Sequence, residues 1–192
     1  MKSRVAILKS FALVVTLVTC VAATQDKTTI RDAAKPEMTA AQPGPEMIKL
    51  NFLVGTWNVD SEYAKSPMIP QGGKATGWYK AQPGPGGFSI LADFEANGPL
   101  GKEVGHQVLS WDPKQQSYIT MTVGNFAGAV IGHARWNGEN LVTESRFEMD
   151  GGTMQMRATY SDIKEKSTHI EETFRVGDGP YQPLWSANAT KK

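Results

Sequence analysis

Cysteine is nearly absent from this sequence, because Cys20 is the only one. Residues 24–192 therefore have no thiol for a disulfide, a thiolate metal site or a cysteine nucleophile. Histidine is also scarce, and His106, His133 and His169 lie more than 25 residues apart. Zinc sites commonly draw on closely spaced pairs of ligands. The sequence therefore predicts no metal site.

Long hydrophobic runs are absent as well, and the longest apolar stretch lies near the start of the chain. Lys2, Arg4 and Lys9 precede or flank the beginning of this stretch, and the small residues Ala22 and Ala23 end it. This order is typical of a secretory signal peptide, which is too short to span a membrane as a helix. We predict a signal peptide over 1–23, and a periplasmic or secreted protein with no transmembrane segment in the mature chain. The alternative is a lipid anchor at Cys20.

A strong excess of positive or negative charge is absent too. Three basic residues leave with the predicted signal peptide, so 17 of the 20 Lys and Arg remain against 19 Asp and Glu. Nucleic-acid binding depends on basic patches that neutralise phosphates. The mature chain has no such patch, and we predict that nucleic acid is not its partner. The sequence does not indicate an oligomeric state.

After the signal peptide, the composition divides the chain into two parts. Residues 24–45 are rich in Thr, Ala, Gln and Pro, which is typical of a flexible linker. Pro45 and Glu46 favour the start of a short helix, with Met47 and Leu50 on its apolar face. We therefore expect one folded domain over 46–192.

From residue 52 onward the sequence predicts strands. Short apolar runs alternate with turn residues such as Asn137-Gly138 and Asp150-Gly151, which tolerate tight hairpins. The expected strands cover 53–63, 74–81, 88–96, 103–111, 117–124, 128–136, 140–149, 152–163, 167–176 and 182–190. No segment is long enough for a helical crossover, so the strands must be antiparallel. Ten such strands favour an all-β, up-and-down, lipocalin-like barrel without open edges.

Several motifs resemble a known family. They are Leu53-Val54-Gly55-Thr56-Trp57, Gly84-Pro85-Gly86-Gly87, Gly105-His106, Trp111-Asp112-Pro113 and Met154-Gln155-Met156-Arg157. Together they resemble the bacterial domain of unknown function 1579 family and, more broadly, lipocalin-type and nitrobindin-type barrels. The resemblance implies the barrel fold, with Trp57 closing one end. It implies no activity.

The candidate ligand contacts follow from this barrel. His106 shares a strand face with Val104 and Val108, and β-branched neighbours favour a covered surface. We therefore predict that the His106 face lines the lumen, where the imidazole either touches a ligand or is satisfied by a neighbouring strand. Trp57 either contacts the ligand or, as we favour, is a structural plug whose indole N–H donates to a backbone carbonyl. We add four further candidate contacts: Trp111, His133, Arg135 and Arg157.

No residue is predicted to be catalytic. Ser66 and Ser89 lack the nucleophile elbow, and the glycine-rich turn at 84–87 lacks the end of a phosphate-binding loop. Asp93 and Glu95 share a strand face, which suits a carboxylate pair or ordinary outward polar residues. Nitrobindin-like barrels hold haem through a late histidine, a role open to His169. However, the segment with Glu171, Glu172 and Arg175 is typical of a solvated face.

These observations favour a non-enzymatic barrel that binds a small, partly apolar molecule in its lumen and needs no cofactor. Mouths and interiors of barrels are frequent ligand sites, and their linings mix apolar surface with a few polar groups. The alternatives are a haem-binding or hydrolytic enzyme that uses the same lumen, and a structural or interaction protein with a packed interior.

Overall fold

The computed structural model describes residues 42–126, 128–149 and 152–192. The predicted signal peptide and most of the predicted linker lie outside these residues. None of the helices in the described part of the chain is long and apolar enough to span a membrane.

The folded part begins with a short helical segment, as predicted. Helix α1 (Pro45–Lys49) has Pro45 in its first turn and continues into the 3-10 helix η1 (Leu50–Leu53). Met47, Leu50 and Leu53 are buried. They pack into an apolar cluster with inward-facing residues of the strands. The helical segment therefore closes one end of the strand assembly.

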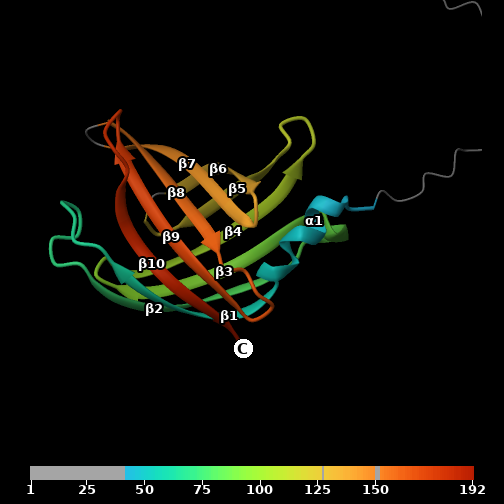
Figure 1. Ribbon diagram of the computed structural model, residues 1–192, viewed down its shortest axis with the longest axis horizontal. Helices are drawn as coiled ribbons and strands as arrows, with labels where there is room; N and C mark the ends of the chain where they lie inside the picture. Colours follow the sequence, from blue (N-terminus) through green and yellow to red (C-terminus); the bar gives the residue numbers. More distant parts are fainter. Residues whose placement is uncertain (1–41, 127, 150–151) are drawn as a thin grey trace, which may run out of the picture. The chain divides into compact units, whose positions relative to one another are not determined.

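Ten strands form a closed antiparallel barrel in the order β1-β10-β9-β8-β7-β6-β5-β4-β3-β2 (Figure 1). Their bounds are β1 (Gly55–Tyr63), β2 (Gly73–Pro83), β3 (Ser89–Gly98), β4 (Gly101–Asp112), β5 (Ser117–Gly124), β6 (Gly128–Asn137), β7 (Asn140–Met149), β8 (Gly152–Ser161), β9 (Ser167–Val176) and β10 (Gln182–Lys191). A 3-10 turn, η2 (Pro85–Gly87), connects β2 to β3. The predicted fold class is confirmed. Each strand pairs with its neighbours in sequence, and β1 pairs with β10 to close the sheet.

The strand register determines which residues face the lumen. Tyr63 lies opposite Trp185, Trp185 opposite Glu172, and Glu172 opposite Ala158. Residues directly opposite each other in paired strands point to the same face. Tyr63 and Ala158 are buried. This row, which includes Glu172, is therefore on the inner face.

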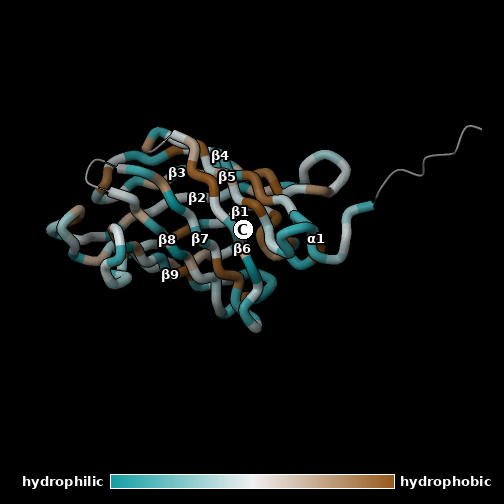
Figure 2. The backbone as a smooth tube through the Cα atoms, turned by 90° about the horizontal axis from the view of Figure 1, so that it is seen from above, coloured by the Kyte–Doolittle hydropathy of each residue, from teal (hydrophilic) through white to brown (hydrophobic). Residues whose placement is uncertain are grey.

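Buried apolar residues form three clusters along the barrel. One cluster lies under α1 and includes Leu50, Leu109 and Tyr118. A second one joins Tyr63, Met154, Phe174 and neighbours. A third joins Trp57, Ala158, Ile170 and Ala189. Apolar stretches are visible along β4 and β5 and beside α1 in Figure 2. Part of the inner face lies outside these clusters, and it is there that the candidate site is found.

Candidate functional site

Trp57 is a structural plug. Its side chain is 2% exposed, and its indole N–H donates to the carbonyl oxygen of Leu53 at 2.8 Å. The Lys191 ammonium lies 5.0 Å from the centre of its ring. These contacts agree with the interpretation that we favoured. Trp111 also faces inward, where it packs edge-on against Tyr118 in the cluster beside α1.

The prediction that the His106 face lines the lumen is wrong. The His106 side chain is 78% exposed, and its Nδ1 lies 2.5 Å from the carboxylate of Asp93, also on the outer face. The inner face of β4 instead carries the buried Gly105. A Cβ at this position would lie 2.5 Å from Cζ of Phe94 and 2.6 Å from the Val123 carbonyl oxygen. The register places residue 105 on the inner face, where the Phe94 ring and the Val123 carbonyl leave no room for a side chain.

The other two histidines are on the outer face as well. His133 is opposite Ile119 and the exposed Glu144. His169 is opposite the exposed Asn188, whose side-chain oxygen is 3.0 Å from its Nδ1. No histidine of the described chain therefore points into the lumen, and the route to haem through His169 is not supported. Asp93 and Glu95 are outward polar residues too, and Glu95 pairs with Lys102 at 3.0 Å.

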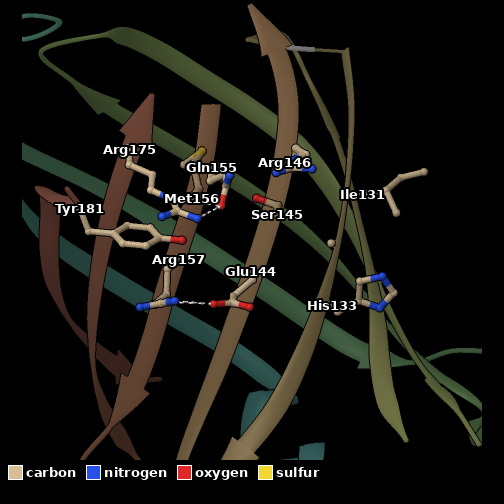
Figure 3. A pocket seen from close by; sticks show the side chains of 11 residues that line it. Ile131, His133, Glu144, Ser145, Arg146, Gln155, Met156, Arg157, Arg175 and Tyr181 are labelled. Carbon is tan, nitrogen blue, oxygen red and sulfur yellow. Dashed lines mark hydrogen bonds and ion pairs between the residues drawn. The ribbon is translucent and has the colours of Figure 1, made fainter. Parts of the chain in front are cut away.

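Three of the predicted contacts lie on the outer wall of the barrel, near a surface groove of about 490 Å³ (Figure 3). His133 and Arg157 line this groove, and Arg135 lines a neighbouring one that shares both of them. These three candidate contacts therefore do not face the lumen, and their role as ligand contacts stays a prediction. The strand register brings them together nonetheless, because Glu144 is opposite both His133 and Arg157.

Several of the charged groups in the groove form ion pairs or hydrogen bonds with neighbouring side chains. Arg157 forms an ion pair with Glu144 at 2.7 Å, and Arg175 donates to Gln155 Oε1 at 2.7 Å. Both guanidinium groups stack on the Tyr181 ring, at 4.3 and 4.8 Å from its centre (Figure 3). Exposed ion pairs of this kind contribute little free energy. The groove accordingly has the character of a cross-strand surface network.

The lumen has a different character, because many of its side chains are only partly buried. Inward-facing residues in a packed plug would lose their accessible surface. Here the following inner residues are half-buried: Val59, Gly77, Tyr79, Phe94, Glu103, Gln107, Thr122, Thr143, Ser145, Phe147, Met156, Tyr160, Glu172 and Trp185. The described interior therefore contains space that side chains do not fill.

A polar network crosses this space. The Tyr63 hydroxyl donates to Glu103 Oε2 at 3.3 Å. The Tyr79 hydroxyl donates to Gln107 Oε1 at 3.1 Å, and the Gln107 amide donates to the Thr122 hydroxyl at 3.3 Å. Burial raises the pKa of Tyr79 far above its ordinary value. The tyrosine hydroxyls therefore remain protonated and act as hydrogen-bond donors at neutral pH.

Glu172 is the most perturbed acid of this network. Burial raises its pKa to about 7, the Trp185 side chain partly opposes the shift, and the charge of Glu103 adds to it. Burial also raises the pKa of Glu103, against the effect of its hydrogen bond from Tyr63. Burial raises the pKa of Tyr63, and the charges of Glu103 and Glu172 raise it further. The charge of Glu103 therefore disfavours ionisation of Glu172 in a region of low dielectric constant.

Sequence reasoning missed Glu172 because it assigned the whole segment to a solvated face. The available signal was the alternation of Ile170, Glu172 and Phe174, since residues two apart on a strand share a face. Ile170 and Phe174 are 8% and 5% exposed. An acid between two buried apolar residues on the same face is an inward-facing acid.

Neither a protein-family model nor a curated protein matches this chain. Among solved structures, Rv2717c from M. tuberculosis is 12% identical, with a TM-score of 0.54 over 79% of this chain and 99% of that one. The S-type phycobiliprotein lyase CPES from Guillardia theta is 10% identical, with a TM-score of 0.50 over 78% of this chain and 98% of that one. These similarities show a lipocalin-like barrel fold. The resemblance to the domain of unknown function 1579 family stays a prediction.

Proposed function

We propose that this chain is an exported protein whose barrel binds a small, partly apolar molecule in its lumen. The single observation that carries the proposal is the incompletely filled inner face, which combines aromatic and methionine side chains with a polar network. Ligand pockets have this composition: mostly apolar walls with a few placed polar groups. A structural protein with a packed interior would show buried side chains at these positions.

Export is proposed from the first residues, whose order is typical of a signal peptide. Mass spectrometry of the protein from soluble and membrane fractions tests this point. A mature chain that begins just after Ala23 supports a soluble protein in the periplasm or outside the cell. A mature chain that begins with a lipidated Cys20 supports the membrane-anchored alternative. Recovery of only the uncleaved chain would contradict export.

A pair of variants on one strand tests binding in the lumen. Ala96 lies on the inner face, opposite Gly77 and Glu103, and the adjacent Asn97 is exposed on the outer face. Ala96→Phe fills part of the lumen, whereas Asn97→Phe adds the same ring outside. Native mass spectrometry of each protein, purified from the compartment where it occurs naturally, should find a small molecule on the wild type and on Asn97→Phe. Equal occupancy in Ala96→Phe, with an intact fold by circular dichroism, would contradict the proposal.

Hydrolysis inside the lumen is a second candidate, and one observation favours it. General acids work best with a pKa near the operating pH, and Glu172 has a pKa of about 7 in the presence of a second carboxyl group, Glu103. The fold is compatible with enzymes as well as binders, since one structural neighbour is a phycobiliprotein lyase. Screening nitrophenyl esters and glycosides tests this candidate. Turnover that Glu172→Gln and Glu103→Gln each abolish would support hydrolysis, whereas turnover that survives both changes would contradict it.

A further inference from the structure

Glu103 and Glu172 approach the lumen from opposite walls. Glu103 is on β4 and Glu172 on β9, and these strands are five positions apart in either direction around the barrel. Both acids lie near Tyr63. Besides burial, the charges of both carboxylates raise the pKa of Tyr63, and its hydroxyl donates a hydrogen bond to Glu103 at 3.3 Å. Tyr63 and Glu172 are two strands apart on one inner row, about 10 Å between their backbones at ~4.8 Å per strand. The two acids therefore face a common space beside Tyr63.

No basic side chain of the described inner face compensates these acids. Lys191 is the only Lys or Arg at an inner position of the described strands, and its ammonium lies over the Trp57 ring. Trp57 and Lys191 are opposite each other, six residues along β10 from Trp185. At about 3.3 Å per residue, Lys191 is roughly 20 Å along the strand from the Glu172 row. A buried carboxylate without a cationic partner is costly, which leaves a place for a cation from outside.

Another feature of the same space indicates a ligand. Among the described residues no hydrogen-bond partner of the Tyr160 hydroxyl is found, although burial raises the pKa of this phenol to about 12. Glu172 contributes to that shift, so the hydroxyl lies close to the acid. None of the fully buried side-chain oxygens or nitrogens in the described residues lacks a partner. The Tyr160 hydroxyl therefore contacts open space next to Glu172.

The lining around the acids suits an organic cation better than a metal ion. Aromatic side chains surround the space, among them Tyr63, Tyr79, Tyr160 and Trp185, and two of the inner positions nearby are the small residues Ala158 and Ala187. The faces of aromatic rings attract organic ammonium groups. Calcium takes six to eight oxygen ligands, more than two carboxyl groups supply.

We infer that the lumen ligand is an organic cation, an amine or quaternary ammonium group on an apolar body, whose charged group lies between Glu103 and Glu172. This inference rests on the proposed binding in the lumen. It makes binding pH-dependent, since a cation favours the charged form of Glu172, whose pKa is about 7 in the free protein. The groups that face Glu172 from neighbouring elements are Glu103, Tyr63, Tyr160 and Trp185. None of them becomes cationic on protonation, so binding should strengthen as the pH rises through 7.

Three probes with one apolar body test the charge of the ligand. They are 4-phenylbutylamine, 4-phenylbutanol and 4-phenylbutyrate, titrated into the wild-type protein by calorimetry at pH 8. We expect the amine to bind at least about 10-fold more tightly than the alcohol, the gain typical of one charge-assisted contact. The carboxylate should bind most weakly. Affinity for the amine should rise about 10-fold from pH 6 to pH 8, while affinity for the alcohol stays constant.

A matched pair of variants locates the charge contact. Glu172→Gln should reduce amine binding about 10-fold and leave alcohol binding unchanged. Glu171→Gln is the control, because the Glu171 side chain is 67% exposed on the outer face, and it should change neither affinity. If the alcohol and the carboxylate bind as tightly as the amine, the cation inference is wrong and lumen binding stands. If none of the three probes binds, the cation inference is wrong, and the occupancy of Ala96→Phe in native mass spectrometry decides lumen binding separately. If Glu172→Gln does not fold, the pH dependence of the wild type decides alone, and a flat profile for the amine overturns the inference.

Discussion

Glu172 should make the stability of this protein fall as the pH rises. Its pKa is about 7 in the folded chain and 4.5 in an ordinary environment, mainly because burial penalises the charged form. The folded state therefore binds the proton more tightly than the unfolded state does. This stabilisation is complete below about pH 4.5 and is lost as the pH rises through 7. The difference corresponds to roughly 3 kcal/mol at 1.36 kcal/mol per pKa unit.

Glu172→Gln measures this contribution, because the amide keeps the shape of the side chain and does not ionise. Urea unfolding of both proteins from pH 4 to pH 8 gives the free energy of unfolding at each pH. The variant should gain about 3 kcal/mol relative to the wild type between these limits. Glu171→Gln, on the outer face, should show no such gain. A difference between Glu172→Gln and wild type that stays constant within about 0.5 kcal/mol would refute the buried-acid reasoning.

Three further predictions concern packing, and each is measured by urea unfolding. Leu50→Ala should cost about 3 kcal/mol of unfolding free energy, because Leu50 is fully buried under the barrel. The control Ile48→Ala should cost less than about 0.5 kcal/mol, because Ile48 is 63% exposed. Equal effects of the two changes would contradict the role of the helix in closing the barrel. Trp57→Phe should cost about 2–3 kcal/mol, since it removes both indole volume and the N–H donor; an unchanged stability would argue against the hydrogen bond. Gly105→Ala should cost about 2 kcal/mol, because its methyl group meets the Phe94 ring and the Val123 carbonyl oxygen; a neutral result would contradict this close packing.

The strands were predictable from the sequence because turn residues mark their ends. The expected strands at 117–124, 140–149 and 167–176 coincide with those observed. The turn predicted at Trp111-Asp112-Pro113 lies at the end of β4, which runs to Asp112. Short links between consecutive strands left antiparallel pairing as the arrangement without crossovers. Turn residues and the short links between strands were therefore sufficient to predict the fold.

The inward-facing residues were not predictable in the same way. Alternation shows which residues share a face, yet it does not show which face is inside when both are mixed. On β4, Val104 is 37% exposed, although β-branched residues suggested a covered surface. The inner face of the same strand carries Glu103, Gly105 and Gln107, a set that looks polar in isolation. Cross-strand neighbours such as Phe94 were required to assign the face, and a single sequence does not give the register that pairs them.

The distribution of the core explains how this barrel tolerates acids in its interior. Apolar clusters beside α1, around Phe174 and around Trp57 bury large side chains, and large buried side chains supply most of the hydrophobic stabilisation of a fold. Inner positions that belong to none of the apolar clusters accommodate Glu103, Gln107 and Glu172. Burying an unpaired carboxylate lowers the stability of the free protein above pH 7. A ligand that pairs with the carboxylate restores that stability by mass action, so a stabilising shift on adding the amine should be larger at pH 8 than at pH 5. Under this proposal Glu172 both lowers the stability of the free protein above pH 7 and gives the lumen its preference for a cation.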